Sequence, residues 1–372
     1  MPHGDGWELS ARVIAEHYDT GDLRVHYRFP RRFSDGELDA SPFLAVLVPV
    51  AMRLGEDLTI DGPVSARLLD QASEAMTVLG SIAQWAPVKV FAEAVAGVPR
   101  PGITAAGFSR GADSWYTVLR NRSRGLTHLV YVPEVEIVYS EATKVRALEA
   151  IADAAARVDC ELVVVESNAR ELTEPLMDWN FAHGPFLASV GLALGGEVST
   201  FLMAGALHFG MFVPIGSHPL LDPLWSTERT AIVHDGAEAT RLQKVRFLAD
   251  HPVALDTLKV CYEADTEFNC GLCSKCLVTM TELYIAGVLD RCPTFPVPLS
   301  RRAILNLPLT TVAGRMWWAD ILMALGPSRR DRQLWRAIQT TMAKADLRTS
   351  VKEGKAALRS AVHELLDRGR GH

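Results

Sequence analysis

The chain has 372 residues, which is too long for one ordinary domain and predicts two or three. Hydrophobic residues make up 48% of it and charged residues 22%, a balance typical of globular proteins with sizeable cores. The net charge of −6 argues against a general nucleic-acid binder, so we expect no nucleic-acid partner.

Membrane and export signals are not evident in the sequence. No apolar run reaches the length of a membrane span, and the N-terminal residues lack the apolar core of a signal peptide. We therefore expect a cytoplasmic protein with no membrane partner. Because thiols stay reduced in the cytoplasm, clustered cysteines there indicate metal ligands or catalysts before disulfides.

Residues 1–100 are expected to form a small α+β domain. The alternating pattern of 22–29 predicts a strand, and 87–95 predicts another. Residues 43–55 are apolar and fit either a strand or a helix, whereas 65–86 begin with a serine and have helical spacing. Proline and glycine between 97 and 102 predict a domain boundary.

Residues 101–260 alternate between short apolar runs and helical patterns. The pattern predicts a doubly wound α/β domain with a parallel five-stranded sheet and a ligand at the carboxyl ends of its strands. The expected helix over 141–158 places its apolar side chains on one face: Val145, Leu148, Ile151, Ala155 and Val158. The expected strands are 103–108, 127–132, 161–167, 199–205 and 211–216.

Residues 281–372 are expected to form a helical C-terminal region. Three segments have helical apolar stripes, 312–326, 329–345 and 351–369. These stripes are most simply packing faces.

The first predicted strand of the α/β domain runs into a loop of small and hydroxylated residues that opens a helix. Backbone N–H groups at such a turn point outward, and the helix dipole favours anions. Ser109 and Ser114 add hydroxyl donors, and Gly111 lets a phosphate approach the backbone. Asp113 could cap the helix or help hold a magnesium ion. The GxxxxGK[ST] pattern is absent, so the loop is not of the Walker type.

This loop resembles the PP-loop, SGGxDS, of the ATP pyrophosphatases, a group of the HUP fold type. The matching residues are Ser109, Arg110, Gly111, Ala112, Asp113 and Ser114. The resemblance implies that this loop binds the β,γ-pyrophosphate of ATP and that the enzyme transfers AMP to a substrate oxygen. Arg110 stands where the family usually has glycine. An arginine could reach a phosphate, but it also makes the loop less permissive.

Four cysteines form the second signal, with eight, two and two residues between them. Four thiolates so close in sequence can close a tetrahedral zinc site, and an iron–sulfur cluster is the rival. Cys160 and Cys292 are isolated and are expected to be ordinary thiols. The predicted metal ligands, in a knuckle over 261–280, are Cys261, Cys270, Cys273 and Cys276.

The loop and the cysteines together resemble the 7-cyano-7-deazaguanine synthase-like enzymes over residues 103–280. The resemblance implies that the four cysteines hold structural zinc. It also implies that the enzyme adenylates a carboxylate, which ammonia converts to an amide, and that a second adenylation dehydrates the amide to a nitrile. The N-terminal unit and helical tail have no counterpart in it, which predicts a divergent member with another substrate.

Polar residues between the fifth predicted strand and the knuckle complete the candidate site. Residues 226–236 are expected to form a helix capped by Ser226, and 237–250 the next helix. Asp235, Glu238 and Arg241 are candidates to contact substrate or ATP phosphates; the alternative is a solvated helix face with internal pairs. His218, at a predicted strand end, could contact phosphate or transfer a proton, or could be structural. His183 and His208 are weaker candidates.

The sequence thus predicts an ATP-dependent ligase or synthase. ATP and Mg²⁺ would bind at the loop, and a small-molecule carboxylate or amide oxygen would be adenylated before ammonia or an amine replaces AMP. The expected catalytic residues are Arg110, Asp113, Ser114 and His218. The alternatives are ATP-dependent sulfur transfer and a nucleotide-binding scaffold that does not cleave ATP. We expect a homodimer, in which the N-terminal unit could pair two chains or hold the substrate.

Overall fold

The computed structural model describes residues 1–4, 6–33, 36–133, 140–211, 213–326 and 331–348. Its centre is a parallel five-stranded sheet with the spatial order β11 (Ala231–Asp235), β10 (Val198–Ala204), β6 (Ile103–Gly107), β7 (Leu126–Tyr131) and β8 (Glu161–Val164). The predicted α/β class with a parallel five-stranded sheet is confirmed. The order is compatible with a doubly wound fold, because the chain moves outward from β6 on one side and returns to its other side at β10.

The fifth strand is not the one that the sequence predicted. Residues 211 and 213–216 are not in a strand, because this run packs against α6 (Trp179–Ala193) instead of a strand. The Gly216 N–H donates to the Asn180 carbonyl at 2.6 Å, and a Cβ on Gly216 would lie 2.0 Å from the Phe181 oxygen. The fifth strand is β11, which lies inside the helix expected over 226–236. Ser226 follows a 3₁₀ turn, Asp222–Trp225, and caps no α-helix.

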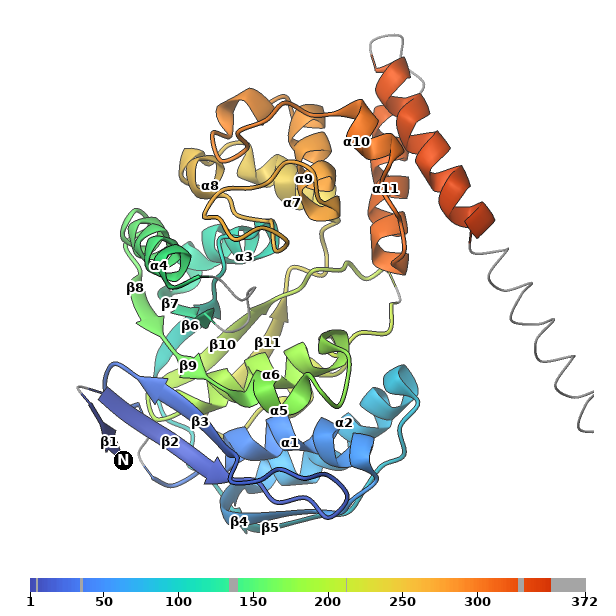
Figure 1. The fold of residues 1–372 in the computed structure, drawn as a ribbon. Coiled ribbons are helices and arrows are strands. Elements are labelled where there is room, and N and C mark those ends of the chain that lie inside the picture. Colours follow the sequence, from blue (N-terminus) through green and yellow to red (C-terminus); the bar gives the residue numbers. More distant parts are fainter. Residues whose placement is uncertain (5, 34–35, 134–139, 212, 327–330, 349–372) are drawn as a thin grey trace, which may run out of the picture.

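Helices cover both faces of this sheet (Figure 1). One face carries α3 (Ala112–Asn121), α4 (Glu141–Ala156) and α7 (Arg241–Leu248), and the other carries α6, which packs on α1 (Ser41–Leu54). In α4 the expected apolar face is partly wrong, because Val145 and Leu148 are exposed. The buried face of α4 instead carries small residues such as Ala147 and Ala154, which let the helix approach the sheet closely.

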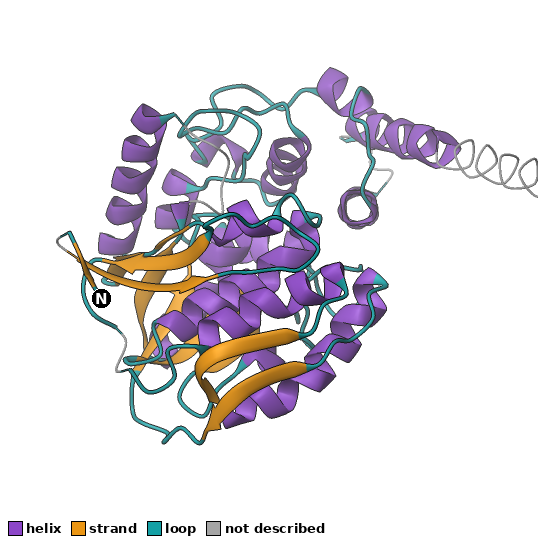
Figure 2. Cartoon of the chain, turned by 60° about the horizontal axis from the view of Figure 1, so that its bottom comes forward, coloured by secondary structure: helices purple, strands orange, loops and turns teal. Residues whose placement is uncertain are grey.

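The N-terminal residues form two smaller sheets (Figure 2). Strands β1 (Pro2–His3), β2 (Gly6–Arg12) and β3 (Arg24–Phe29) are antiparallel, and β4 (Leu58–Ser65) pairs in parallel with β5 (Val90–Val95). The apolar segment 43–55, which fitted either element, lies in helix α1, and α2 (Ala66–Ala83) is capped by Ser65.

The strand expected over 161–167 divides into two. Its first half is β8, and its second half, β9 (Glu166–Ser167), leaves the central sheet and pairs with β3. The N-terminal elements and one face of the central sheet therefore share a continuous core.

The C-terminal part lies beyond the carboxyl edge of the central sheet (Figure 1). Its helices are α8 (Pro252–Thr257), α9 (Ser274–Ile285), α10 (Arg301–Leu305), α11 (Val312–Leu325) and residues 332–348. The helix expected over 351–369 falls outside the described residues. Within the described ranges, no helix has the length and apolarity needed to cross a bilayer.

Candidate functional site

The predicted phosphate loop lies between the end of β6 and the start of α3. Gly111 is the N-cap of α3 and offers no side chain to the first N–H groups of the helix, which an α-helix leaves without internal partners. The Ser114 hydroxyl donates to the Gly111 carbonyl at 3.0 Å and accepts from the Ser109 N–H at 3.3 Å. Phe108 packs edge-on against Trp115 at 4.8 Å and anchors both ends of the loop in the core. A strand, a tight turn and a bare helix N-terminus thus follow one another in the arrangement that binds anions.

Arg110 adopts a backbone conformation that favours glycine. Its φ is +60°, in the left-handed region, and the residue is buried. Glycine would adopt this conformation without the steric cost that a Cβ imposes. The Arg110 carbonyl accepts the Lys259 N–H at 3.0 Å, so a segment next to the cysteines holds the loop in shape.

Asp113 lies between two buried cations. Its Oδ1 accepts from Lys244 Nζ at 3.2 Å, and its Oδ2 accepts from Arg241 Nη1 at 3.0 Å. The Lys244 side chain is only 1% exposed, and its Nζ also donates to the Gly205 carbonyl at the end of β10. Burial raises the pKa of Asp113, but Lys244 and Arg241 outweigh it and hold this pKa below its usual value. Asp113 is therefore an ionised carboxylate that orients two cations beside the loop.

Arg241 joins this group to the C-terminal helices. Its Nη2 donates to Thr279 Oγ1 at 2.7 Å, its Nε lies 3.2 Å from Glu282 Oε2, and its guanidinium stands 5.4 Å from the Trp317 ring centre. Burial raises the pKa of Glu282 to about 7 in spite of Arg241. Helices α9 and α11 thus contribute side chains to the carboxyl edge of the sheet.

Asp235 and Glu238 point toward α3. Asp235 Oδ2 accepts from the Thr117 hydroxyl at 2.8 Å. Glu238 accepts from the Tyr116 hydroxyl at 2.8 Å and pairs with Arg120. Glu238 precedes α7, whose N-cap is Thr240, so the helical face it was expected to share with Arg241 does not form. The structure therefore places Arg241 with the loop and gives the two carboxylates partners on α3.

The candidate histidines lie in other settings. His218 Nδ1 accepts the Leu220 N–H at 3.1 Å, and His183 Nδ1 lies 3.2 Å from the Trp179 carbonyl. His208 Nε2 stands 3.8 Å from Asp320 of α11. In the described chain no hydrogen bond or ion pair joins His218 to the loop.

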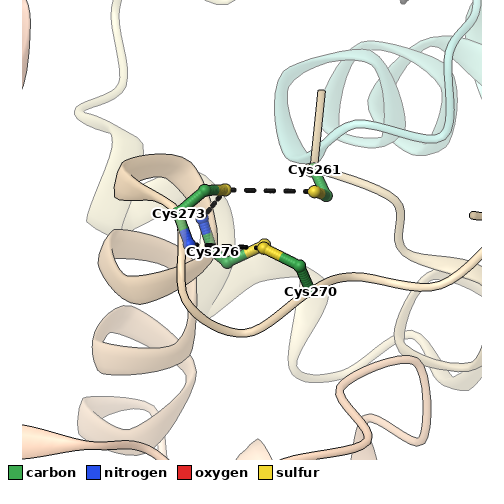
Figure 3. Close-up of side chains that lie close together, drawn as sticks. All are labelled: Cys261, Cys270, Cys273 and Cys276. Atoms are coloured by element: carbon green, nitrogen blue, oxygen red, sulfur yellow. Dashed lines mark hydrogen bonds between the residues drawn. The ribbon is translucent and has the colours of Figure 1, made fainter. Parts of the chain in front are cut away.

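The four predicted cysteine ligands come together (Figure 3). Their sulfurs all lie within 4.8 Å of one another, with the pair Cys270–Cys276 at 3.8 Å and the pair Cys261–Cys273 at 4.0 Å. Cys273 and Cys276 start α9, and Gly271 turns the chain between Cys270 and Cys273 with φ +70°. This cluster could hold a metal ion and is compatible with structural zinc.

Two buried side chains shape the cysteine segment. Asn269 Oδ1 accepts the N–H groups of Val260 and Cys261 at 2.8 and 3.0 Å, and its Nδ2 donates to the Leu258 carbonyl at 2.9 Å. Lys259 Nζ donates to the carbonyls of Thr266 and Phe268, the latter at 2.8 Å. Because Lys259 also binds Arg110 through its N–H, the cysteine segment and the phosphate loop are mechanically joined.

Sequence reasoning gave no role to three residues of the site. Lys244 lies three residues after Arg241, so helical spacing alone could have placed it on the same side. Thr279 and Glu282 are polar residues at that same spacing in the apolar helix α9, a pattern that could have marked them.

Comparisons of the chain with protein-family models, with curated proteins and with solved structures found no match. The functional assignment therefore depends on the chemistry of the site itself.

Proposed function

We propose that the protein is an ATP-dependent enzyme that adenylates a carboxylate or amide oxygen of a small molecule and then replaces AMP with a nitrogen nucleophile. One observation carries the proposal: the loop from Ser109 to Ser114 opens α3 at the carboxyl end of β6, where the strand order reverses toward β10. Ligands bind at this position in open α/β sheets.

Positive groups converge on the same place. The free N–H groups of α3 and the hydroxyls of Ser109 and Ser114 would bind the terminal phosphates of ATP. Lys244 and Arg241 would neutralise the pyrophosphate as it leaves. Magnesium would supply further charge neutralisation, and Asp113 would help hold it after exchanging one of its present partners, Arg241 or Lys244.

The reaction is a displacement at the α-phosphorus. The substrate oxygen forms a bond to this phosphorus, the bond to the bridging oxygen breaks, and pyrophosphate leaves with the electron pair. The nitrogen nucleophile then attacks the activated carbon, and AMP leaves with the former substrate oxygen. The side chains at the loop act by positioning and by charge stabilisation.

The cysteine cluster is proposed to be a structural zinc site. Four sulfurs bound tetrahedrally at about 2.3 Å from one zinc ion stand about 3.8 Å apart. The separations of 3.8 and 4.0 Å fit that arrangement. Thiolates that ligate the separate irons of a four-iron cluster stand further apart, so the geometry supports the nitrogen route over sulfur transfer through such a cluster.

A non-catalytic nucleotide-binding role is the second candidate. It is favoured by Asp113, both of whose oxygens are already occupied by Arg241 and Lys244. A carboxylate in that state must exchange partners before it can contact magnesium.

The proposal is tested by incubating the protein with magnesium-ATP, ammonium and a panel of small carboxylic acids, with AMP and pyrophosphate as the products measured. We expect Ser114→Ala to lower AMP formation by about 100-fold, because it removes a donor near the transferring phosphates. Ser123→Ala, on the exposed turn after α3, is the matched control. Release of ADP in place of AMP would contradict the proposal, and ATP binding without cleavage would favour the second candidate.

A further inference from the structure

A second polar cluster lies on the α6 face of the sheet, outside the loop. At its centre is Asp222, whose side chain is 0% exposed. Its carboxylate accepts from the Ser217 hydroxyl at 2.8 Å, the His218 N–H at 3.2 Å and His234 Nδ1 at 2.7 Å. Three donors around a buried carboxylate indicate a fixed anion.

Asp222 sets the orientation and tautomer of His234. An ionised carboxylate can only accept, so Nδ1 of His234 carries the proton and Nε2 has the free lone pair. The His234 side chain is 4% exposed, and its Nε2 is buried with no hydrogen-bond partner among the described residues. Buried polar atoms without partners are uncommon in folded proteins, and a catalytic role or a bound water or ion is among their explanations.

Gly205 connects this lone pair to the proposed site. A Cβ on Gly205 would lie 2.3 Å from His234 Nε2, so the Gly205 backbone lies directly beside this nitrogen. The Gly205 carbonyl accepts Lys244 Nζ, and Lys244 in turn pairs with Asp113 of the loop. The free nitrogen of His234 therefore lies beside the carboxyl end of β10. Gly205 stands between it and Lys244, one of the two cations that would hold the phosphates.

We propose that His234, held by Asp222, is the proton acceptor that converts an ammonium ion or a protonated amine into the attacking nucleophile. This inference rests on the proposed function. His234 Nε2 takes one proton from ammonium, and the resulting ammonia forms the carbon–nitrogen bond. The carbon–oxygen bond to AMP breaks, AMP leaves with its electron pair, and the second proton of the nitrogen passes to water. Asp222 stabilises the imidazolium that forms.

The neighbouring titratable groups are compatible with this role. Burial lowers the pKa of His183 of α6, which also senses the charges of Asp222 and Lys275. Burial lowers the pKa of His218; His234 lowers it further when it is protonated, and Asp222 opposes both effects. Both neighbours are therefore uncharged at neutral pH, and Lys244 is the cation that donates to the Gly205 carbonyl.

The first test needs no knowledge of the acid substrate. Nuclear magnetic resonance of the ring nitrogens in ¹⁵N-histidine-labelled protein is recorded with and without saturating magnesium-ATP. We expect His234 to be protonated on Nδ1 and bare on Nε2, with an Nε2 resonance that shifts when ATP binds. His128, a buried histidine of β7 that pairs with Glu161 at 3.2 Å, is the internal control and should not shift.

Protonation of His234 on Nε2, or no shift although calorimetry shows ATP bound, would overturn the inference. Absence of ATP binding to the wild-type protein would instead count against the proposed function.

The second test separates a proton acceptor from a structural histidine. Hydroxylamine is an uncharged nucleophile at mildly alkaline pH and needs no base, whereas ammonium must lose a proton. With an acid that the wild-type enzyme turns over, we expect His234→Gln to lower ammonium-dependent amide formation at least about 100-fold. The hydroxylamine-dependent rate should fall much less.

Asp222→Asn should show the same selective loss, and His128→Gln should change neither rate. Equal losses with both nucleophiles would overturn the inference, because a merely structural defect would slow both reactions alike.

Discussion

Arg110 places a guanidinium in the loop but has a backbone conformation that is sterically unfavourable for any residue with a Cβ. A non-glycine residue in the left-handed region loses roughly 1–2 kcal/mol relative to the right-handed region. Arg110 has φ +60°, and the hydrogen bond from Lys259 holds it there. The conformation of the loop is thus maintained by its surroundings and is not set by a glycine.

Two substitutions separate the backbone strain from the side chain. Both Arg110→Gly and Arg110→Ala remove the guanidinium, but only Arg110→Ala keeps a Cβ at φ +60°. We expect the glycine variant to have the larger free energy of unfolding, by about 1 kcal/mol. Denaturant unfolding of the two variants measures this difference, and equal stabilities would show that the strain is relieved elsewhere.

Glu282 should give the protein a recognisable pH dependence. Its folded-state pKa is raised to about 7 from an ordinary value of 4.5, so the folded state holds the proton more tightly than the unfolded state. The stabilisation is complete below about pH 4.5 and is lost as the pH rises through about 7, with a slope of at most about 1.4 kcal/mol per pH unit. Asp113 has a lowered pKa, so it loses its contribution only at more acidic pH.

Glu282→Gln removes this titration. We expect the variant to lose less stability than the wild type between pH 4.5 and 7, as measured by denaturant unfolding at a series of pH values. Glu149→Gln, on the exposed side of α4, is the control and should keep the wild-type slope. Identical slopes for all three proteins would contradict the assignment.

At the residue scale, local spacing predicted the loop and the cysteines. Ser109–Ser114 and the ligands Cys270, Cys273 and Cys276 are close in sequence, so their chemistry is visible without the fold. Lys244 contacts Asp113 of the loop, and Thr279 and Glu282 contact Arg241, because α7 and α9 pack beside the loop. His234 received no role because its strand was predicted as a helix.

At the scale of elements, the cysteine segment is closed from both sides. On one side, Asn269 Oδ1 accepts the N–H groups of Val260 and Cys261. On the other, Cys273 is the N-cap of α9, and its sulfur accepts the Cys276 N–H at 3.4 Å. The arrangement that could hold a metal ion is therefore built into the start of a helix. Loss of one thiolate should affect the metal and the helix together.

Cys276→Ser tests this element against a matched thiol. We expect this variant to lose the bound metal ion and to unfold at a lower temperature, because a tetrahedral site needs all four thiolates. Cys292→Ser changes another buried cysteine, one that donates to the Leu255 carbonyl outside the cluster, and should retain the metal. The number of metal ions bound per chain is measured by mass spectrometry. One metal ion per chain in Cys276→Ser would contradict the four-ligand site.

The misplaced fifth strand has a physical explanation. Residues 211–216 and 231–233 are both short and apolar, so periodicity alone does not separate them. The choice is made by packing, since Gly216 lies against the backbone of α6, where only glycine fits, whereas β11 pairs with β10. Contacts distant in sequence thus decide which run joins the sheet.

At the scale of the whole molecule, the N-terminal elements and the central sheet depend on each other. The Tyr27 hydroxyl of β3 and the Ser189 hydroxyl of α6 are hydrogen-bonded at 2.7 Å, and β3 pairs with β9. Nearly all of α1 is buried, largely against α6. No local pattern in residues 1–100 indicates these partners, which is why the sequence suggested an independent unit.

A fragment of residues 1–100 should therefore not fold stably by itself. It would expose the apolar surface of α1 and leave β3 without its β9 neighbour. We expect little fixed tertiary structure in the nuclear magnetic resonance spectrum of the fragment. A dispersed spectrum with cooperative unfolding would contradict the shared core.

The most direct test of the central claim is calorimetric titration of the purified protein with magnesium-ATP. We expect the wild-type protein to bind one ATP and Lys244→Met to lose most of the affinity, because the buried ammonium beside Asp113 would no longer neutralise the phosphates. Lys144→Met, on the exposed face of α4, is the control and should bind as the wild type does. Failure of the wild-type protein to bind ATP, or equal binding by Lys244→Met, would contradict a nucleotide site at the carboxyl edge of the sheet.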